Sequence, residues 1–241
     1  RLGREQEISS QTARTRLSGR DHQKLPRRLQ RLRCEQTGEM HDMLVIKYQK
    51  KDSVCFISHI DLLRHMERIM RRAHIEVKFS QGFNPHPLMF FSPPLSLGVA
   101  SSAEYLSIDS NMDPDDVLEK YNASVPEGLK ASTVFACSKN PNLQAKVTCA
   151  DYVFPTDKAV EIGDEFFIEY SKKGETVKEN VADKIYAQYK KDGKLVLRLA
   201  SGMVNLRPDR VLEKLNLVLG ENMSVTGIEK IAQYVDVNGA L

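Results

Sequence analysis

Two histidines, His59 and His86, are the side chains in this sequence best suited to proton transfer. His59 follows Ser58 at the start of an expected helix, and His86 lies in the loop sequence QGFNPHP, residues 81–87. Imidazole accepts and donates protons near neutral pH. A helix N-terminus beside a polar loop also binds anions such as phosphate. The pattern predicts an anion-binding pocket, with acid–base catalysis by His59 or His86 as the alternative.

The loop QGFNPHP is expected to be stiff and to hold its polar side chains in set directions. Gly82 permits a backbone conformation that other residues rarely adopt, whereas Pro85 and Pro87 fix their own φ angles and restrict the residues before them. Loops are common places for binding sites. The candidate binding residues of the loop are Gln81, Gly82, Asn84 and His86. A tight turn around a buried Phe83 is the structural alternative.

An arginine stripe follows the expected helix. Its members recur at helical spacing and are Arg64, Arg68, Arg71 and Arg72. The planar guanidinium donates paired hydrogen bonds to phosphate in a geometry that lysine does not match. Asp61 and Glu67 are the acidic residues of this helix, so local pairing does not cancel the positive charge. The stripe predicts contacts with RNA phosphates, and a solvated helix face is the alternative.

The cysteine and histidine spacings contain no familiar metal or cofactor signature. The four cysteines stand at positions 34, 55, 137 and 149 without a CxxC pair, which excludes the usual zinc and iron–sulfur motifs. His59, His65 and His86 match no standard ligand spacing either. We therefore predict no metal and no cofactor, and we expect the cysteines to be reduced, buried thiols.

The elements around these residues predict an α+β fold that begins with a ferredoxin-like βαββαβ unit. The expected order is strand 44–48 extended by 54–57, a helix from Ser58, strand 75–79, strand 104–108, helix 113–123 and strand 129–137. Segment 88–91 is a candidate extra strand. Ser58 and Asp61 form the helix cap, and Ile60 belongs to the apolar stripe of the helix. In this topology the helix start and the loop 81–87 lie at the same end of the sheet.

The chain divides into three parts by composition. Residues 1–42 carry ten Arg or Lys and six Asp or Glu, with few aromatic or β-branched residues, which predicts a basic, disordered extension. Residues 43–138 form the ferredoxin-like domain, and the turn cluster 139–142 marks its end. Residues 143–241 are expected to form a smaller second α+β domain. Its expected elements are strands 150–154 and 166–170, helix 177–189, strand 195–199, a helix ending before Gly220 and strand 225–235.

The bulk composition is that of an ordinary soluble protein. Hydrophobic residues make up 41% of the chain and charged residues 28%, and the net charge is +3. No apolar run approaches the length of a membrane span, and no secretory signal is present. These features predict a cytoplasmic protein without membrane contact. Net charge alone does not argue for nucleic-acid binding.

Two long runs of the sequence resemble a known family. The segments FISHIDLLRHMERIMRRAHIEVKFSQGFNPHP (56–87) and SPPLSLGVASSAEYLSIDS (92–110) closely resemble the bacterial radical SAM-associated (radical-SAM-linked) protein family, a domain of unknown function. NLRPDRVL (205–212) also resembles the family's pattern. The resemblance implies a cytosolic bacterial protein encoded beside, or fused to, a cobalamin-type radical SAM protein, often near RNA-processing and ribosomal genes. It implies no established activity, and the radical chemistry would belong to the partner.

The sequence therefore favours an accessory protein that recognises or presents a substrate, with RNA as the candidate, for a radical SAM partner. The alternatives are a ferredoxin-like RNA-binding protein or a metal-independent RNA endonuclease that uses His59 or His86. The RNA-binding alternative requires aromatic side chains on the sheet face for stacking with bases. The candidates are Phe79, Phe90, Phe91 and Tyr105. Because a fold does not determine a function, the sequence leaves open whether the protein is an enzyme.

Overall fold

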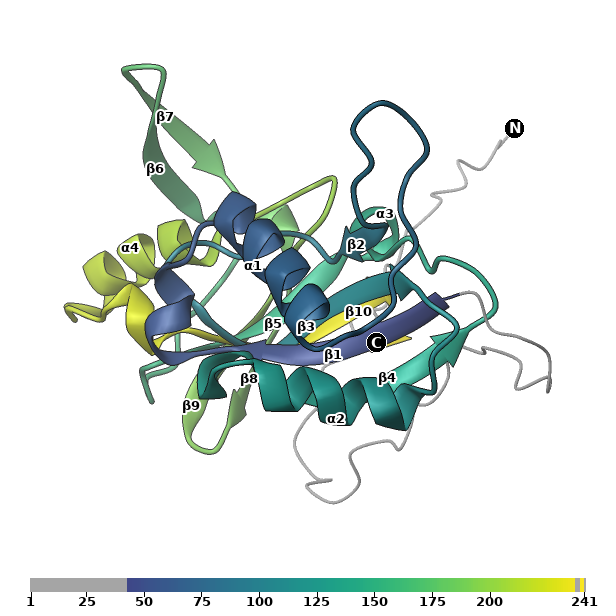
Figure 1. The fold of residues 1–241 in the computed structure, drawn as a ribbon. Coiled ribbons are helices and arrows are strands. Elements are labelled where there is room, and N and C mark those ends of the chain that lie inside the picture. Colours follow the sequence, from purple (N-terminus) through teal and green to yellow (C-terminus); the bar gives the residue numbers. More distant parts are fainter. Residues whose placement is uncertain (1–42, 237–238, 241) are drawn as a thin grey trace, which may run out of the picture.

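The computed structural model describes residues 43–236 and 239–240, so the expected basic extension 1–42 lies outside the described residues. Within them the protein is a mixed α+β fold with a mostly antiparallel sheet and few helices (Figure 1). This confirms the predicted α+β class. No helix of these ranges is long and apolar enough to cross a membrane.

The described elements alternate between strands and short helices. The strands are β1 (Met43–Lys50), β2 (Met89–Phe91), β3 (Ala100–Asp109), β4 (Ala131–Cys137), β5 (Cys149–Phe154), β6 (Phe167–Lys172), β7 (Glu175–Asn180), β8 (Ile185–Lys191), β9 (Lys194–Ala200), β10 (Glu229–Asp236) and β11 (Gly239–Ala240). The α-helices are α1 (His59–Arg72), α2 (Pro114–Ser124), α3 (Leu143–Lys146) and α4 (Pro208–Leu219). The 3-10 turns are η1 (Asp52–Phe56), η2 (Glu127–Leu129), η3 (Ala182–Lys184) and η4 (Val225–Gly227).

One large sheet runs through both halves of the described chain. Its order is β4-β1-β3-β10-β5-β9-β8, and β2 pairs with the last residues of β3. The junction between the halves is a short parallel pairing, in which Ala100 and Ser101 of β3 face Glu229 and Lys230 of β10. The pairs β1–β3, β1–β4 and β5–β9 are antiparallel. The separate hairpin β6–β7 projects from the body of the protein (Figure 1).

Three apolar clusters hold the sheet and its helices together. The first packs alternate residues of β1, such as Leu44 and Ile46, against α1 and α2. The second packs β5 and β9 against α4. The third includes Val45 and Tyr105 and packs against Leu143 of the short helix α3. Because strand side chains alternate between faces, β1 contributes its even-numbered residues to the first cluster and its odd-numbered ones to the third.

The helices with strong local signals form where the sequence predicts them. The Ser58 hydroxyl accepts a hydrogen bond from the Asp61 amide at 3.1 Å and caps α1. Asp113 caps α2 in front of Pro114, and α4 ends at Gly220, whose φ is +63°. These are the preferred roles of the three residue types. One member of the expected apolar stripe of α1 differs, because Ile60 is exposed.

Three strand and helix assignments made from the sequence are wrong. Segment 75–79 forms only a single bridge, between Phe79 and Pro87, and the strand that joins the sheet is β2, in the segment considered as an extra strand. Segment 54–57 lies largely in the turn η1. The expected helix 177–189 is the end of β7 followed by β8. A four-residue spacing of apolar side chains is also a multiple of two, so it fits a strand as well as a helix.

Two tight turns explain why that region forms hairpins. Lys173 and Gly174 join β6 to β7, and Asp192 and Gly193 join β8 to β9, with all four residues at positive φ. Positive φ at both central residues is the mark of a hairpin turn that matches the twist of its strands. The Asp-Gly pair was therefore the signal that distinguishes this region from a helix.

The cysteines follow the expectation in part. Cys55 and Cys149 are buried free thiols. Cys137 is buried as well, and Cys34 lies outside the described residues.

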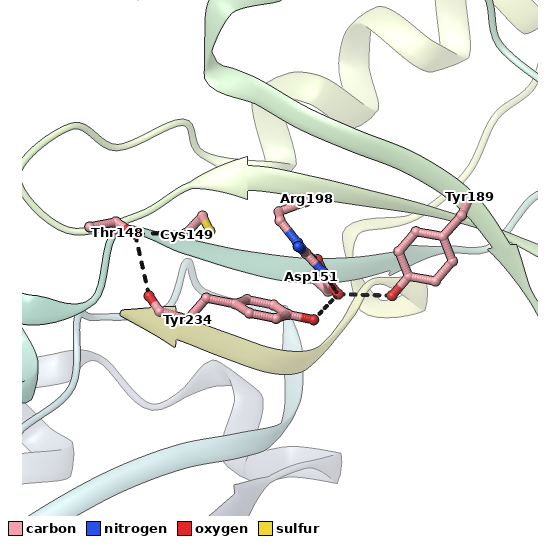
Figure 2. Close-up of polar contacts among 6 residues, drawn as sticks. All are labelled: Thr148, Cys149, Asp151, Tyr189, Arg198 and Tyr234. Atoms are coloured by element: carbon pink, nitrogen blue, oxygen red, sulfur yellow. Dashed lines mark hydrogen bonds and ion pairs between the residues drawn. The ribbon is translucent and has the colours of Figure 1, made fainter. Parts of the chain in front are cut away.

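A buried carboxylate ties four neighbouring strands together. Asp151 of β5 is fully buried and accepts hydrogen bonds from Arg198 of β9, with Nε to Oδ1 at 2.8 Å and Nη2 to Oδ2 at 3.1 Å. The hydroxyls of Tyr189 on β8 and Tyr234 on β10 also donate to Oδ2 (Figure 2). The Arg198 guanidinium lies 3.8 Å from the centroid of the Tyr234 ring. The carboxylate is thus fully partnered, which is typical of a structural ion pair.

Replacing Asp151 is expected to destabilise the protein strongly. Asp151→Ala leaves the Arg198 charge and two tyrosine hydroxyls without their acceptor, and breaking such a buried pair costs about 3–5 kcal/mol. Denaturant unfolding measures the free energy of unfolding. The matched control is Glu169→Ala, which removes an exposed carboxylate 4.0 Å from Lys178 and is expected to cost less than about 1 kcal/mol. Equal costs for the two variants would contradict the structural role of Asp151.

Candidate functional site

Three charged side chains are buried in the middle of the sheet, at the junction of its two halves. Lys50 of β1, Glu104 of β3 and Lys230 of β10 have exposed fractions of 2%, 4% and 1%. The Lys230 ammonium lies 2.6 Å from the Glu104 carboxylate. The Lys50 ammonium donates to the carbonyl of Ile57 at 2.8 Å. Two buried ammonium groups therefore face one buried carboxylate, which leaves an excess of positive charge.

Lys50 is the buried ammonium group that has no carboxylate of its own, because Glu104 pairs with Lys230. Burial lowers the pKa of its ammonium group, nearby Glu104 opposes that effect, and nearby Lys230 adds to it. Among the described residues its hydrogen-bond acceptor is the single carbonyl of Ile57, although an ammonium group has three hydrogens to donate. Burying a positive charge without an opposite charge or enough hydrogen-bond acceptors lowers the stability of the folded protein. An anionic ligand would supply both.

A small pocket opens at this charge. Its lining residues are Tyr48, Lys50, His59, Leu62, Phe91, Ser92, Pro94, Leu95 and Glu104. The cavity volume is about 10 Å³, which is room for one atom the size of a water oxygen. Phe91 and Leu62 belong to the first apolar cluster, whereas Leu95 packs against the second, so the pocket lies between the two.

Tyr48 supplies a second hydrogen-bond donor to the pocket. It stands directly opposite Glu104 in the β1–β3 pairing, and its side chain is buried. Its hydroxyl makes no hydrogen bond with any residue that the structure describes. Burial raises the pKa of this hydroxyl well above its ordinary value, and the nearby Glu104 charge raises it further. The group is therefore protonated at neutral pH and available as a donor.

His59 lines the same pocket, whereas Ser58 has a different role. The His59 ring meets the Phe91 ring edge-on, with centroids 5.8 Å apart. Burial lowers the pKa of His59, and the nearby Lys50 charge lowers it further. Ser58 uses its hydroxyl to cap α1 and to donate to the Asp61 carboxylate at 2.7 Å. Ser58 is therefore a helix cap beside the pocket.

The loop 81–87 does not meet this pocket, which corrects the expected arrangement. Asp109 pairs with Met43 at the first residue of β1, and the backbone amide of Lys78 donates to Asp109 at 2.9 Å. The loop continues outward from there (Figure 1). Lys50 is the last residue of β1, at its other end, and His59 lines the same pocket as Lys50. The expectation failed because it placed the edge strand before the loop. The actual strand β2 follows the loop, which reverses the end of the sheet at which the loop lies.

The loop itself is held by local hydrogen bonds. The Ser80 hydroxyl lies 2.9 Å from Nδ1 of His86 and accepts a hydrogen bond from the His86 amide at 3.1 Å. The Ser80 amide donates to the His86 carbonyl at 2.8 Å. All residues from 81 to 86 are exposed. The alternative of a turn around a buried Phe83 is therefore wrong.

The four arginines of α1 do not form one free stripe. Arg64 pairs with Asp61 at 3.3 Å and Arg71 with Glu67 at 3.0 Å, both on the exposed surface. Arg72 donates to the carbonyl of residue 124 at the end of α2. Arg68 makes no ion pair or hydrogen bond with the described residues. Half of the predicted stripe is therefore neutralised in place.

Arg68 and Arg72 edge an apolar groove between α1 and η2. Its lining residues are Ile57, His65, Arg68, Ile69, Arg72, Pro126 and Leu129, and its volume is about 190 Å³.

Of the four aromatic residues considered for stacking on bases, Phe91 and Tyr105 are buried, whereas Phe79 and Phe90 are exposed. Within residues 43–236 and 239–240 no group of three or more His, Cys, Asp or Glu side chains is placed to hold a metal ion.

Sequence reasoning missed three polar residues that line the pocket, Tyr48, Lys50 and Glu104. It also missed Lys230, which pairs with Glu104. One signal was available for Lys50, because it continues the even-numbered series of β1 that points into the core. A lysine in such a position is almost never buried without a partner. The two charged groups near it, Glu104 and Lys230, come from strands far away in the sequence, so the pattern of β1 alone did not identify them.

Comparison with known proteins places the chain in a family without giving it an activity. No curated protein matches the chain. Residues 43–203, more than half of the chain, match the family DUF2344, which is described as an uncharacterized protein conserved in bacteria. That description names no radical SAM partner and no ligand, so both stay predictions. The chain belongs to the DUF2344 family of bacterial proteins.

Proposed function

We propose that this protein recognises an anionic, phosphate-bearing ligand through the pocket of Tyr48, Lys50 and His59. The observation that carries the proposal is the buried excess of positive charge, two ammonium groups against one carboxylate. An oxygen atom of an anion fits the pocket volume and would accept hydrogen bonds from Lys50 and Tyr48. We propose RNA as the ligand class and the pocket as the site for one phosphate oxygen.

The position of α1 strengthens the attraction for an anion. His59 is the first residue of this 14-residue helix, and the N-terminus of an α-helix carries a partial positive charge. Arg68 and Arg72 at the groove beside the helix add two cations, of which Arg68 is without a partner among the described residues. These groups extend the positive surface along the helix, where further phosphates would bind.

We further propose that the protein acts as an accessory to a cobalamin-type radical SAM enzyme, encoded nearby or fused, and presents the bound substrate to it. The support is the resemblance of residues 56–87 and 92–110 to radical-SAM-linked proteins. The pocket also contains the Ser92 hydroxyl, which accepts hydrogen bonds from the Tyr105 amide at 3.3 Å and from the Gln233 side chain at 3.2 Å. The sheet therefore holds this hydroxyl, rather than the base His59 activating it. A site of that kind suits recognition better than covalent chemistry.

We also propose that residues 43–138 form a ferredoxin-like domain and residues 143–241 a second unit. The support is the antiparallel order β4-β1-β3-β2 with α1 and α2 as its two helices. The buried residues of the first apolar cluster all come from residues 43–138. Nearly all buried residues of the second cluster come from residues 143–241.

The alternative of an RNA endonuclease has one observation in its favour. The exposed Ser80–His86 hydrogen bond holds an imidazole with its second nitrogen available to a ligand, as a catalytic base requires. His59 and His86 lie at opposite ends of β1, so a mechanism that uses both on one phosphate is not supported. RNA turnover by the purified protein, lost in His86→Ala, would favour this alternative.

Sulfate is a suitable probe for the pocket because its charge does not change across the useful pH range. We expect sulfate to raise the melting temperature of the wild-type protein as its concentration rises, as a ligand of the folded state does. Lys50→Met should abolish that response without loss of stability, because it removes an uncompensated buried charge. Differential scanning fluorimetry at constant ionic strength measures both effects.

Lys51→Met is the matched control for this experiment. Lys51 is the next residue and pairs with Glu229 at the surface at 2.8 Å, so the response to sulfate should persist in this variant. An equal response of wild type and Lys50→Met would show that sulfate acts elsewhere. That result would remove the pocket from the proposed function.

The lowered pKa of His59 predicts a pH effect of defined sign. The unfolded chain, with a histidine pKa of about 6.5, binds a proton more readily than the folded protein does. His59 therefore lowers the free energy of unfolding progressively as the pH falls through about 6.5. His59→Gln should remove this loss of stability at low pH. The free energy of unfolding of the variant, measured in denaturant, should therefore rise relative to that of wild type as the pH falls below about 6.5. A relative stability that is independent of pH would contradict the burial of a neutral His59. The exposed His65, changed to Gln, is the control.

Co-expression tests the proposed partnership. A radical SAM protein encoded beside the gene, or the corresponding fused domain, should co-purify with the tagged chain. Arg68→Ala should leave complex formation intact if this residue serves the ligand, whereas the joint activity should fall because a phosphate contact is lost. Absence of a complex at micromolar concentrations of both proteins would contradict the accessory role and leave the sulfate result unaffected.

A further inference from the structure

The loop of residues 81–87, between α1 and β2, presents the aromatic ring of Phe83 to solvent. Figure 1 shows this segment projecting away from the sheet. Its base is closed by the Phe79–Pro87 bridge and by the hydrogen bonds between Ser80 and His86. Gly82, with φ of +140°, provides the sharp change of direction. The base of the loop is therefore closed by its own contacts and joined to β3 through Lys78 and Asp109.

Phe83 at the far end of this loop is the most exposed of the large apolar side chains, with an exposed fraction of 106%. An apolar ring gains free energy when it leaves water. A ring that is fully exposed on a held loop, rather than folded back onto it, is well placed to be covered by a ligand.

The neighbours of Phe83 are polar. The amides of Gln81 and Asn84 are exposed and form no hydrogen bond with the part of the chain that the structure describes. Side-chain amides offer both donors and acceptors, which is the pattern needed to read the edge of a nucleobase. The segment 77–88 contains no acidic residue that would repel a phosphate.

We infer that Phe83 stacks on an unpaired nucleobase of RNA, while Gln81 and Asn84 contact the edge of that base. Recognition of RNA typically uses unstacked bases covered by aromatic rings and hydrogen-bonded at their edges. A ring that inserts into a protein partner is surrounded by other apolar contacts that exclude water, and the polar neighbours of Phe83 do not provide them. The inference rests on the proposed RNA ligand and adds a base-binding site at the other end of β1 from the pocket.

The absence of tryptophan from the sequence allows a direct test. Phe83→Trp introduces the single indole of the chain, and stacking on a base quenches indole fluorescence. Single-stranded oligouridylate and oligoadenylate are the probes, and the anisotropy of the same labelled RNAs measures binding in parallel. We expect quenching of Phe83→Trp at the RNA concentrations that bind wild type. Phe83→Ala should bind about tenfold more weakly, a loss of about 1.4 kcal/mol, because stacking on the base is removed.

Leu217 offers a control, because its side chain is also exposed, at 81%, and lies in α4, away from the loop and from the pocket. Leu217→Trp should show no quenching, and Leu217→Ala should bind RNA as wild type does. Gln81→Ala and Asn84→Ala should change the ratio of affinities for the two RNAs, because they alter edge contacts rather than stacking.

The possible outcomes separate this inference from the proposed function. RNA binding by wild type, with no quenching of Phe83→Trp and no loss in Phe83→Ala, would overturn base stacking and leave RNA as the ligand. No RNA binding by wild type would overturn both, while the sulfate experiment still tests the pocket. Quenching by the co-expressed protein partner without RNA would instead assign the loop to protein docking and overturn the inference.

Discussion

The burial of Lys50, Glu104 and Lys230 in the centre of the sheet is the constraint on which the rest of the structure depends. Lys230 lies at the parallel pairing of β3 and β10, where the two halves of the sheet join. Its ion pair with Glu104 therefore connects the halves through charge as well as through backbone hydrogen bonds. Loss of either partner would leave an unpaired charge in the core. This destabilises the folded protein far more than loss of a surface ion pair does. Lys50 beside them has no such partner, and this asymmetry is the physical basis of the proposed anion site.

The separation of the pocket from the loop 81–87 limits the kind of ligand that would use both. They lie at opposite ends of β1, an eight-residue strand whose length is about 25 Å at roughly 3.3 Å per residue. A single small anion would contact one of the two sites. An extended single-stranded ligand with a charged backbone and unstacked bases would reach both, with its phosphates near α1 and a base at Phe83. This geometry is the reason why RNA, rather than a mononucleotide, is the ligand in our account.

The parts of the fold that the sequence predicted correctly are those determined by neighbouring residues. The start of α1 follows from Ser58 and Asp61, and the end of α4 from Gly220, because caps act within a single turn. The turn residues Asp192 and Gly193 indicate the hairpin β8–β9. The hairpin was nevertheless missed, because the spacing of apolar residues before them fits a helix and a strand equally. The edge strand was misplaced because segment 75–79 alternates as a strand does, whereas its pairing depends on the distant residue Asp109.

The candidate site was predicted in part for the same reason. His59 was identified because it stands at a recognisable helix start. Lys50, Glu104 and Lys230 were not identified, because they come together only when β1, β3 and β10, which are far apart in the sequence, lie side by side. The loop residues Gln81, Asn84 and Phe83 were visible in the sequence as a stiff polar loop, but their distance from His59 followed from a strand order that the pattern did not determine.

A crystal structure of the protein soaked with tungstate, a heavy analogue of phosphate, tests the central claim most directly. The account predicts an anomalous peak at the mouth of the pocket, with one tungstate oxygen within hydrogen-bond distance of both the Lys50 ammonium and the Tyr48 hydroxyl. A pocket that holds only water at saturating tungstate, with Lys50 turned toward Glu104 instead, would contradict it.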